Sequence, residues 1–254
     1  MTLRLPIAPR TLTRLLALTV AALAAAGVAL QYLKHIRGHD HVFGLVRLFD
    51  LDRESNVPTW YASAALLLAG LLVAGVAGEK RRAADPFARH WTGLAAILVY
   101  LSCDEGAALH EHLILPIQQG LGLDGVFYFA WVVVGIPVAG LVAIAYARFL
   151  RSLPRPTARL IALAGALYVA GAIGLEMVGA WWWDRHGGGD RFAYALITAV
   201  EETLEMAGVV VFIHAIAAYA AGPGGDAAAA EARPAGALGR SRPGAPLPAG
   251  APGG

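Results

Sequence analysis

Six apolar runs divide the chain, and each is long enough to cross a membrane as an α-helix. They cover residues 15–33, 58–78, 91–112, 126–149, 158–183 and 192–219. A helix rises about 1.5 Å per residue, so roughly 20 apolar residues span the hydrocarbon layer of a bilayer. The pattern predicts an all-α fold, a six-helix transmembrane bundle joined by short polar connections.

Local signals mark some of the helix ends and one packing face. Asn56 and Pro58 suit the cap and the first turn of the second helix, and Asp124 is placed to cap the fourth. In the fifth run, small residues recur every four positions, at Ala166, Ala170 and Gly174. Such a face permits close packing between membrane helices.

The two ends of the chain are predicted to lie outside the bundle. Residues 1–14 form a short basic segment. The run that follows is either a signal peptide with small residues for cleavage at 24–26, or an uncleaved first helix, and its length favours the helix. Residues 222–254 are rich in Gly, Ala and Pro and have no apolar face, which predicts a disordered tail.

The distribution of charge predicts the orientation of the bundle. Lys and Arg gather in the N-terminal segment and in the short connections 79–90 and 148–159, whereas 113–125 has none. The positive-inside rule therefore places both termini in the cytoplasm. Only 15% of the residues are charged and the net charge is +2, so no nucleic-acid partner is expected. Cys103 is the only cysteine, which excludes an internal disulfide and cysteine-rich metal sites.

The third run ends in an acidic stretch, residues 102–112. Acidic groups inside a membrane helix are costly and rare, so they are candidates for function. If the helix continues to His112, the side chains of Asp104, Glu105, Glu111 and His112 fall on one arc of about 120°. His110 then points elsewhere.

The fifth and sixth runs bring further acids to the depth of Asp104. At about 1.5 Å per residue, Glu176, Glu201, Glu202 and Glu205 all fall in the outer half of the membrane. No Lys or Arg lies inside these runs at that depth. The acids therefore need protons, a bound cation or a water-filled cavity.

Carboxylate and histidine side chains in one place predict a divalent metal site for iron, manganese, zinc or calcium. The candidate ligands are Asp104, Glu111, His112, Glu176, Glu201 and Glu205, of which Glu111 and Glu205 are also the candidate catalytic bases. The first prediction of function is a metal-dependent enzyme that acts on a lipid or another apolar substrate. The alternatives are a proton- or ion-coupled transporter that uses the same acids as a relay, and a structural or accessory membrane subunit.

Three motifs also carry a resemblance to a known group. They are Asn56-x-Pro58-Thr59-Trp60, Asp104-Glu105-x-x-x-x-His110-Glu111 and Glu201-Glu202-x-x-Glu205-Met206. Together they resemble a group of uncharacterised bacterial polytopic membrane proteins. The resemblance implies a multi-pass protein of the bacterial cytoplasmic (inner) membrane, and no established activity carries over from it.

Overall fold

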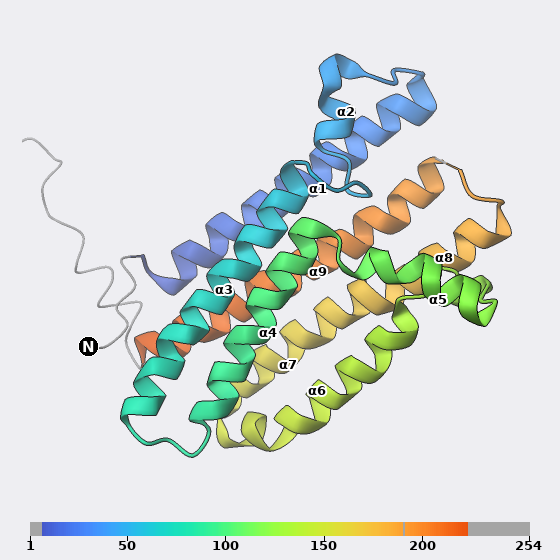
Figure 1. Cartoon of the computed structure of the whole chain (residues 1–254). Coiled ribbons are helices and arrows are strands. Elements are labelled where there is room, and N and C mark those ends of the chain that lie inside the picture. The colour runs from blue at the N-terminus through green and yellow to red at the C-terminus, as the bar shows by residue number, and fades with distance from the viewer. Residues whose placement is uncertain (1–6, 190, 223–254) are drawn as a thin grey trace, which may run out of the picture.

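The computed structural model describes residues 7–189 and 191–222, and every regular element within them is helical (Figure 1). The longer helices are α1 (Pro9–Arg37), α3 (Val57–Arg82), α4 (Ala88–Ala107), α6 (Val132–Ser152), α7 (Arg155–Val169), α8 (Glu176–Arg185) and α9 (Phe192–Ala221). The shorter ones are η1 (Val42–Gly44), α2 (Leu45–Leu48), η2 (His110–Leu113), α5 (Ile114–Leu121), η3 (Gly125–Phe127) and the π-helix η4 (Ala170–Leu175). The all-α prediction is confirmed for the described residues, whereas the predicted tail lies outside them from residue 223 onwards.

Five helical stretches are long and apolar enough to cross a membrane. They are Pro9–Arg37, Val57–Arg82, Val132–Ser152, Arg155–Arg185 and Phe192–Ala221. A sixth is obtained if α4 and the segment His110–Leu121 count as one span, but the chain bends by 75° between them. The third predicted helix is therefore a broken one.

Helix α9 lies at the centre of the bundle. It packs against α1, α3 and α7, and α3 in turn packs against α4, while α6 lies on the outside beside α7 (Figure 1). The main apolar core is built around side chains such as Val73, Trp91 and Ile213, which are 1% exposed or less. The ring of Trp91 contacts that of Phe149 with a centroid distance of 4.9 Å.

Both described chain ends lie at the same end of the bundle as the turns 83–87 and 153–154 (Figure 1). A hydrogen bond of 2.8 Å between Thr13 Oγ1 and His214 Nδ1 joins the start of α1 to the last part of α9 there. This end of the bundle also carries the basic connections noted in the sequence. The long connection 38–56 and the connection between α8 and α9 lie at the opposite end (Figure 1).

The expectation that helix 91–112 is continuous is wrong. Helix α4 ends at Ala107, and Ala108 adopts a left-handed conformation with φ 48°. The Asp104 side chain accepts a hydrogen bond from the backbone N–H of His110 at 2.8 Å. A side chain that takes up a backbone N–H in this way competes with the helical hydrogen bonds and favours a turn. The apolar pattern of the sequence gives no indication of this competition, so it did not predict the break.

The caps of the second and fourth predicted helices have different outcomes. Asn56 Oδ1 accepts a hydrogen bond from the Thr59 backbone N–H at 3.1 Å, so the predicted cap of α3 is confirmed. Asp124 makes no side-chain cap bond, and α6 begins only at Val132. The preceding residues form η3, whose Gly125 N–H donates to Asp184 Oδ2 at 3.0 Å.

Close packing of α7 and η4 against α9 uses glycines that lie off the predicted small-residue face. A Cβ on Gly208 would lie 2.8 Å from the carbonyl oxygen of Ala164, and one on Gly171 would lie 2.8 Å from that of Glu201. Ala166, Ala170 and Gly174 are exposed instead. The prediction of a close-packed face at those three residues is therefore wrong, since the helix turns a neighbouring face toward α9.

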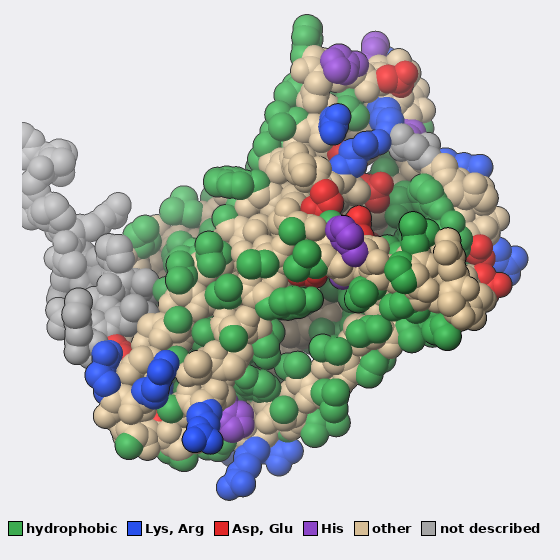
Figure 2. All heavy atoms as spheres, in the orientation of Figure 1, with side chains coloured by type: hydrophobic (Ala, Val, Ile, Leu, Met, Phe, Trp, Pro, Cys, Tyr) green, Lys and Arg blue, Asp and Glu red, His purple; other side chains and the backbone are tan. Residues whose placement is uncertain are grey.

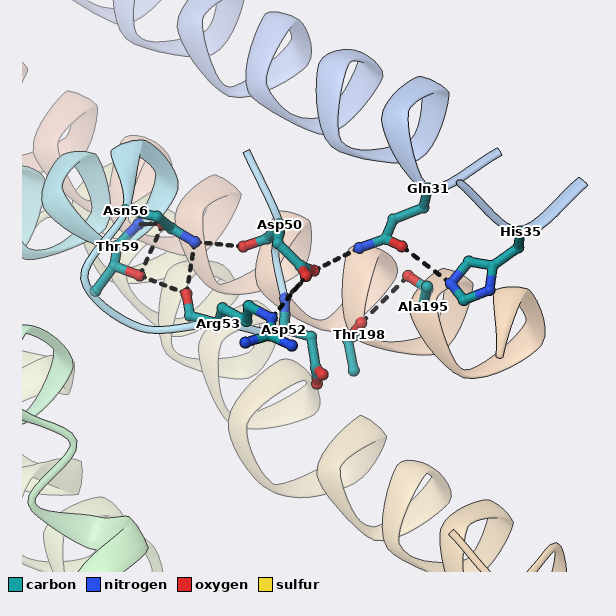
Figure 3. Close-up of polar contacts among 9 residues, drawn as sticks. All are labelled: Gln31, His35, Asp50, Asp52, Arg53, Asn56, Thr59, Ala195 and Thr198. Atoms are coloured by element: carbon teal, nitrogen blue, oxygen red, sulfur yellow. Dashed lines mark hydrogen bonds and ion pairs between the residues drawn. The ribbon is translucent and has the colours of Figure 1, made fainter. Parts of the chain in front are cut away.

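A buried carboxylate holds the connection 38–56 against the bundle (Figure 3). Asp50 is 4% exposed, and its Oδ1 accepts a hydrogen bond from Gln31 Nε2 of α1 at 2.6 Å. Its Oδ2 accepts from Arg53 Nε at 3.2 Å. The backbone carbonyl of Asp50 also accepts from the side chain of Asn56, at the start of α3. The connection is thus joined to two helices through one residue.

Candidate functional site

The acidic site begins at the end of α4, where Asp104 pairs with His110. The distance from His110 Nδ1 to Asp104 Oδ2 is 3.0 Å, and both side chains are partly buried. The break after Ala107 brings His110 back over its own helix, which a continuous helix would not allow. The expected arc of Asp104, Glu111 and His112 is therefore not formed.

Glu111 and His112 lie at the surface. Both side chains are exposed, and His112 Nδ1 is bonded to the backbone carbonyl of Ala108 at 2.9 Å. Glu111 still interacts electrostatically with Glu54 and His110, so it lies at the rim of the site. The structure places His112 outside the group of interacting acids.

Trp131 extends the Asp104–His110 pair toward α8. The rings of His110 and Trp131 lie with centroids 4.8 Å apart, and Trp131 Nε1 donates a hydrogen bond of 2.8 Å to Glu176 Oε1. Glu176 is the first residue of α8, directly after the π-helix η4. π-Helical turns often occur at functional sites, because the extra residue re-aims the side chains that follow.

Two further contacts link the site to the central helix. The carboxyl group of Glu176 lies next to that of Glu201, and one turn along α9 Glu205 lies next to the hydroxyl group of Tyr168 on α7. Glu205 also interacts electrostatically with Asp104. The structure thus brings together four predicted site residues, Asp104, Glu176, Glu201 and Glu205, from α4, α8 and α9.

Sequence reasoning left three contributors out of the site. Glu54 lies in the connection before α3, Trp131 directly precedes α6, and Tyr168 lies on α7. The sequence could have indicated Tyr168 as a site residue, because it is the only residue from 160 to 175 whose side chain can form a hydrogen bond. Glu54 lies outside the predicted helices, and Trp131 lies in the apolar run 126–149, which contains no acid, so nothing in the sequence connects them to the site.

Several of the acids lie next to a hollow in the surface of the bundle. Glu202 and Glu205 are partly exposed although α9 is the central helix, and Glu105 is partly exposed on α4. Figure 2 shows a hollow on this face between α4 and α6, with acidic and histidine side chains gathered next to it. Ionisable side chains in such a hollow can be reached by water or by a small ligand.

No basic side chain of the flanking connection reaches the acids. Arg185 lies over the ring of Trp181 at 5.8 Å, and Arg191 lies over that of Trp182 at 5.9 Å. Tryptophan at this position is typical of the interfacial belt of membrane proteins. These two arginines therefore stack on indole rings instead of neutralising the carboxylates of the site.

The grouping of the acids does not match a metal site. Within residues 7–189 and 191–222, no three Asp, Glu, His or Cys side chains lie close enough together to hold a metal ion. The interacting side chains form pairs, Asp104 with His110 and Glu176 with Glu201. Since a divalent ion needs at least three or four ligands, the arrangement does not fit one. The metal-dependent enzyme stays an untested prediction.

The chain was compared with protein families, curated proteins and solved structures. Residues 15–220 match the family described as a domain of unknown function, DUF8692. The chain belongs to this family. No curated protein and no solved structure matches the chain. The DUF8692 match covers all the elements that build the acidic site, from α3 to α9.

Glu54 gives the DUF8692 site a dependence on pH. The pKa of Glu54 is raised from 4.5 to about 7, first by burial and then by the charges of Glu111 and Asp104, while His110 lowers it. Its Oε2 atom is buried without a hydrogen-bond partner among the described residues. The folded state therefore holds a proton on Glu54 that the unfolded chain releases at lower pH.

We expect the Glu54→Gln variant to lose part of the pH dependence of stability. A raised acid pKa gives stability that is fully present below pH 4.5 and is lost as the pH rises through about 7. The melting temperature of the wild type in detergent should fall across this interval more than that of the variant. Asp40→Asn, at an exposed acid, is the control and should follow the wild type. Parallel curves for wild type and Glu54→Gln would contradict the assignment.

Proposed function

We propose that the chain is a multi-pass protein of the bacterial inner membrane with six crossings and both termini in the cytoplasm. The five apolar helices and the bent pair of α4 with α5 support six crossings. The arginine-rich turns lie at the same end as both described chain ends, which supports a cytoplasmic position for that end. The acidic hollow then lies toward the outer face.

We further propose that the acidic site serves proton- or ion-coupled transport. The observation that carries this proposal is the close approach of the carboxyl groups of Glu176 and Glu201. Two ionised carboxylates so close together would repel each other, so the proposal places one proton between them. Glu201 is 8% exposed, and no Lys or Arg occurs in α8 before Arg185 or anywhere in α9. Protons are therefore the available counter-charge at this pair.

The contacts arrange the protonatable groups in an order suited to a relay. Glu54 and Glu111 lie at the rim, Asp104 and His110 follow, and the chain continues through Glu176 and Glu201 on α8 and α9. The Glu205–Tyr168 pair is the last member. Beyond it the apolar core fills the half of the bundle near the chain ends. A proton or cation would thus enter from the outer side and stop at α9 until the helices rearrange.

Infrared spectroscopy of the purified full chain tests the shared proton. We expect an absorption band of a protonated carboxyl group at neutral pH, which shifts in heavy water. The band should lose intensity in Glu201→Gln, because the amide removes one of the two sharing groups, while the contribution of Glu54 remains. Glu111→Gln makes the same change at an exposed carboxylate and should keep the band.

Transport itself is measured in proteoliposomes that contain a pH-sensitive dye. A potassium diffusion potential, negative inside, should drive faster acidification with wild-type protein than in protein-free vesicles. Glu201→Gln should acidify no faster than protein-free vesicles, while Asp40→Asn, at an exposed acid outside the site, should behave like the wild type. Equal rates for Glu201→Gln and wild type would contradict the relay. Elemental analysis of the same preparations addresses the metal-dependent enzyme, since stoichiometric metal that is lost in Glu201→Gln would favour it.

A further inference from the structure

A cluster of four arginines surrounds the turn between α6 and α7, far from the acidic site. Arg148 and Arg151 lie on the last two turns of α6, and Arg155 and Arg159 lie on the first two turns of α7. All four side chains are exposed. Residues three or four positions apart share one face of a helix, so each helix presents a pair of guanidinium groups next to the turn.

This arginine cluster has no acidic counter-charge nearby in the chain. The sequence contains no Asp or Glu from Gly125 to Leu175. In the described part of the chain, none of the four arginines forms an ion pair. The other turn at this end differs, because Lys80 pairs with Asp85 at 3.4 Å and Glu79 adds a further acid.

The surroundings of the cluster are those of a lipid contact. Large apolar side chains on the two helices point outward next to the arginines, among them Leu141, Ile144 and Leu163. Figure 2 shows Lys and Arg side chains along this end of the bundle, with hydrophobic side chains directly adjoining them. A ligand that covers both surfaces needs an anionic head and an apolar tail.

We propose that the arginine cluster binds the headgroup of an anionic phospholipid. The guanidinium group binds phosphate oxygens through two parallel hydrogen bonds, and it is the usual choice for phosphate recognition. Charge complementarity selects the anionic lipid over a zwitterionic one, and the exposed apolar faces of α6 and α7 take the acyl chains. The site is separate from the acidic hollow and depends only on the protein residing in a membrane.

Native mass spectrometry of the full chain in detergent tests this site. Phosphatidylglycerol and phosphatidylcholine with the same acyl chains are the probes. We expect phosphatidylglycerol to bind more tightly than phosphatidylcholine, and each arginine removed to weaken its binding by about fivefold. Arg151→Gln/Arg155→Gln should therefore lose affinity by roughly 25-fold, whereas Arg81→Gln/Arg82→Gln, at two exposed arginines of the other turn, should change it little.

Several outcomes would overturn the proposal. Equal affinity for the two lipids would show that charge is not recognised, and an equal loss in both double variants would indicate only a diffuse positive surface. Displacement of phosphatidylglycerol by an equal concentration of inorganic phosphate would identify a site for free phosphate instead. Arg151→Lys/Arg155→Lys keeps the charge but loses the two-bond geometry, so it should retain part of the affinity. Melting temperatures of all variants verify that they are folded.

Discussion

Gly208→Leu is expected to lower the free energy of unfolding by about 3 kcal/mol, because it forces α9 away from α7. A Cβ at this position would lie 2.8 Å from the carbonyl oxygen of Ala164 and 2.9 Å from the backbone nitrogen of Tyr168. Both atoms belong to the backbone, so no side-chain rotation relieves the clash. The separation would also pull Tyr168 away from Glu205 and open the acidic site.

Thermal unfolding in detergent measures this effect, and α7 offers a matched control. Gly165→Leu introduces the same side chain one residue from Ala164, where nothing lies within 4 Å of the added Cβ. Since this position is exposed, the melting temperature should stay near that of the wild type. A similar loss at both glycines would show that the membrane domain resists leucine in general, and that the contact between α7 and α9 is not special.

Asp50→Ala is expected to destabilise the protein by about 3 kcal/mol, since it removes the charged acceptor that holds the connection 38–56. Gln31 is 5% exposed, and its Nε2 would lose its acceptor in an environment where water cannot replace it. Arg53 would lose its partner as well, although its exposed side chain can turn to solvent. Buried donors without an acceptor carry the full cost of desolvation, which is why the effect is large.

The melting temperature of Asp50→Ala should drop, and the connection should become accessible to protease before the helices unfold. Asp50→Asn keeps an acceptor for Gln31 but presents an amide donor to Arg53, so its loss should be smaller. Asp40→Ala, in the same connection, is exposed and should be nearly neutral. If Asp50→Ala melts like the wild type, the network in Figure 3 contributes nothing to stability.

Local patterns in the sequence were sufficient for the elements whose causes are local. The apolar runs predicted the long helices, because a helix in lipid must bury all its backbone hydrogen bonds internally and needs about 20 apolar residues to do so. Asn56 predicted the start of α3, because a cap bonds a backbone N–H only three residues away. Counting residues along the helices was also enough to place Asp104, Glu176, Glu201 and Glu205 at a shared depth, where the structure brings them together.

The tertiary structure alone decided how the acidic site is built. Asp104 ends its own helix by bonding His110. The partner of this acid is therefore the histidine that a continuous helix would have pointed away from it. Glu54 joins the site from a connection that carries no periodic signal. Periodicity gives the direction of a side chain only while the helix continues, and it contains nothing about which helices are neighbours.

The same distinction applies to the packing of the bundle. The sequence contains 30 glycines and the small-residue face of the fifth run, and each of them permits close contact. Only the positions of α7, η4 and α9 in space select Gly171 and Gly208, where an added Cβ would meet backbone atoms. The sequence thus determined which segments become helices and at which level along them the acids lie. The tertiary structure decided which faces meet, because a contact depends on the distance between two segments and no single segment encodes that distance.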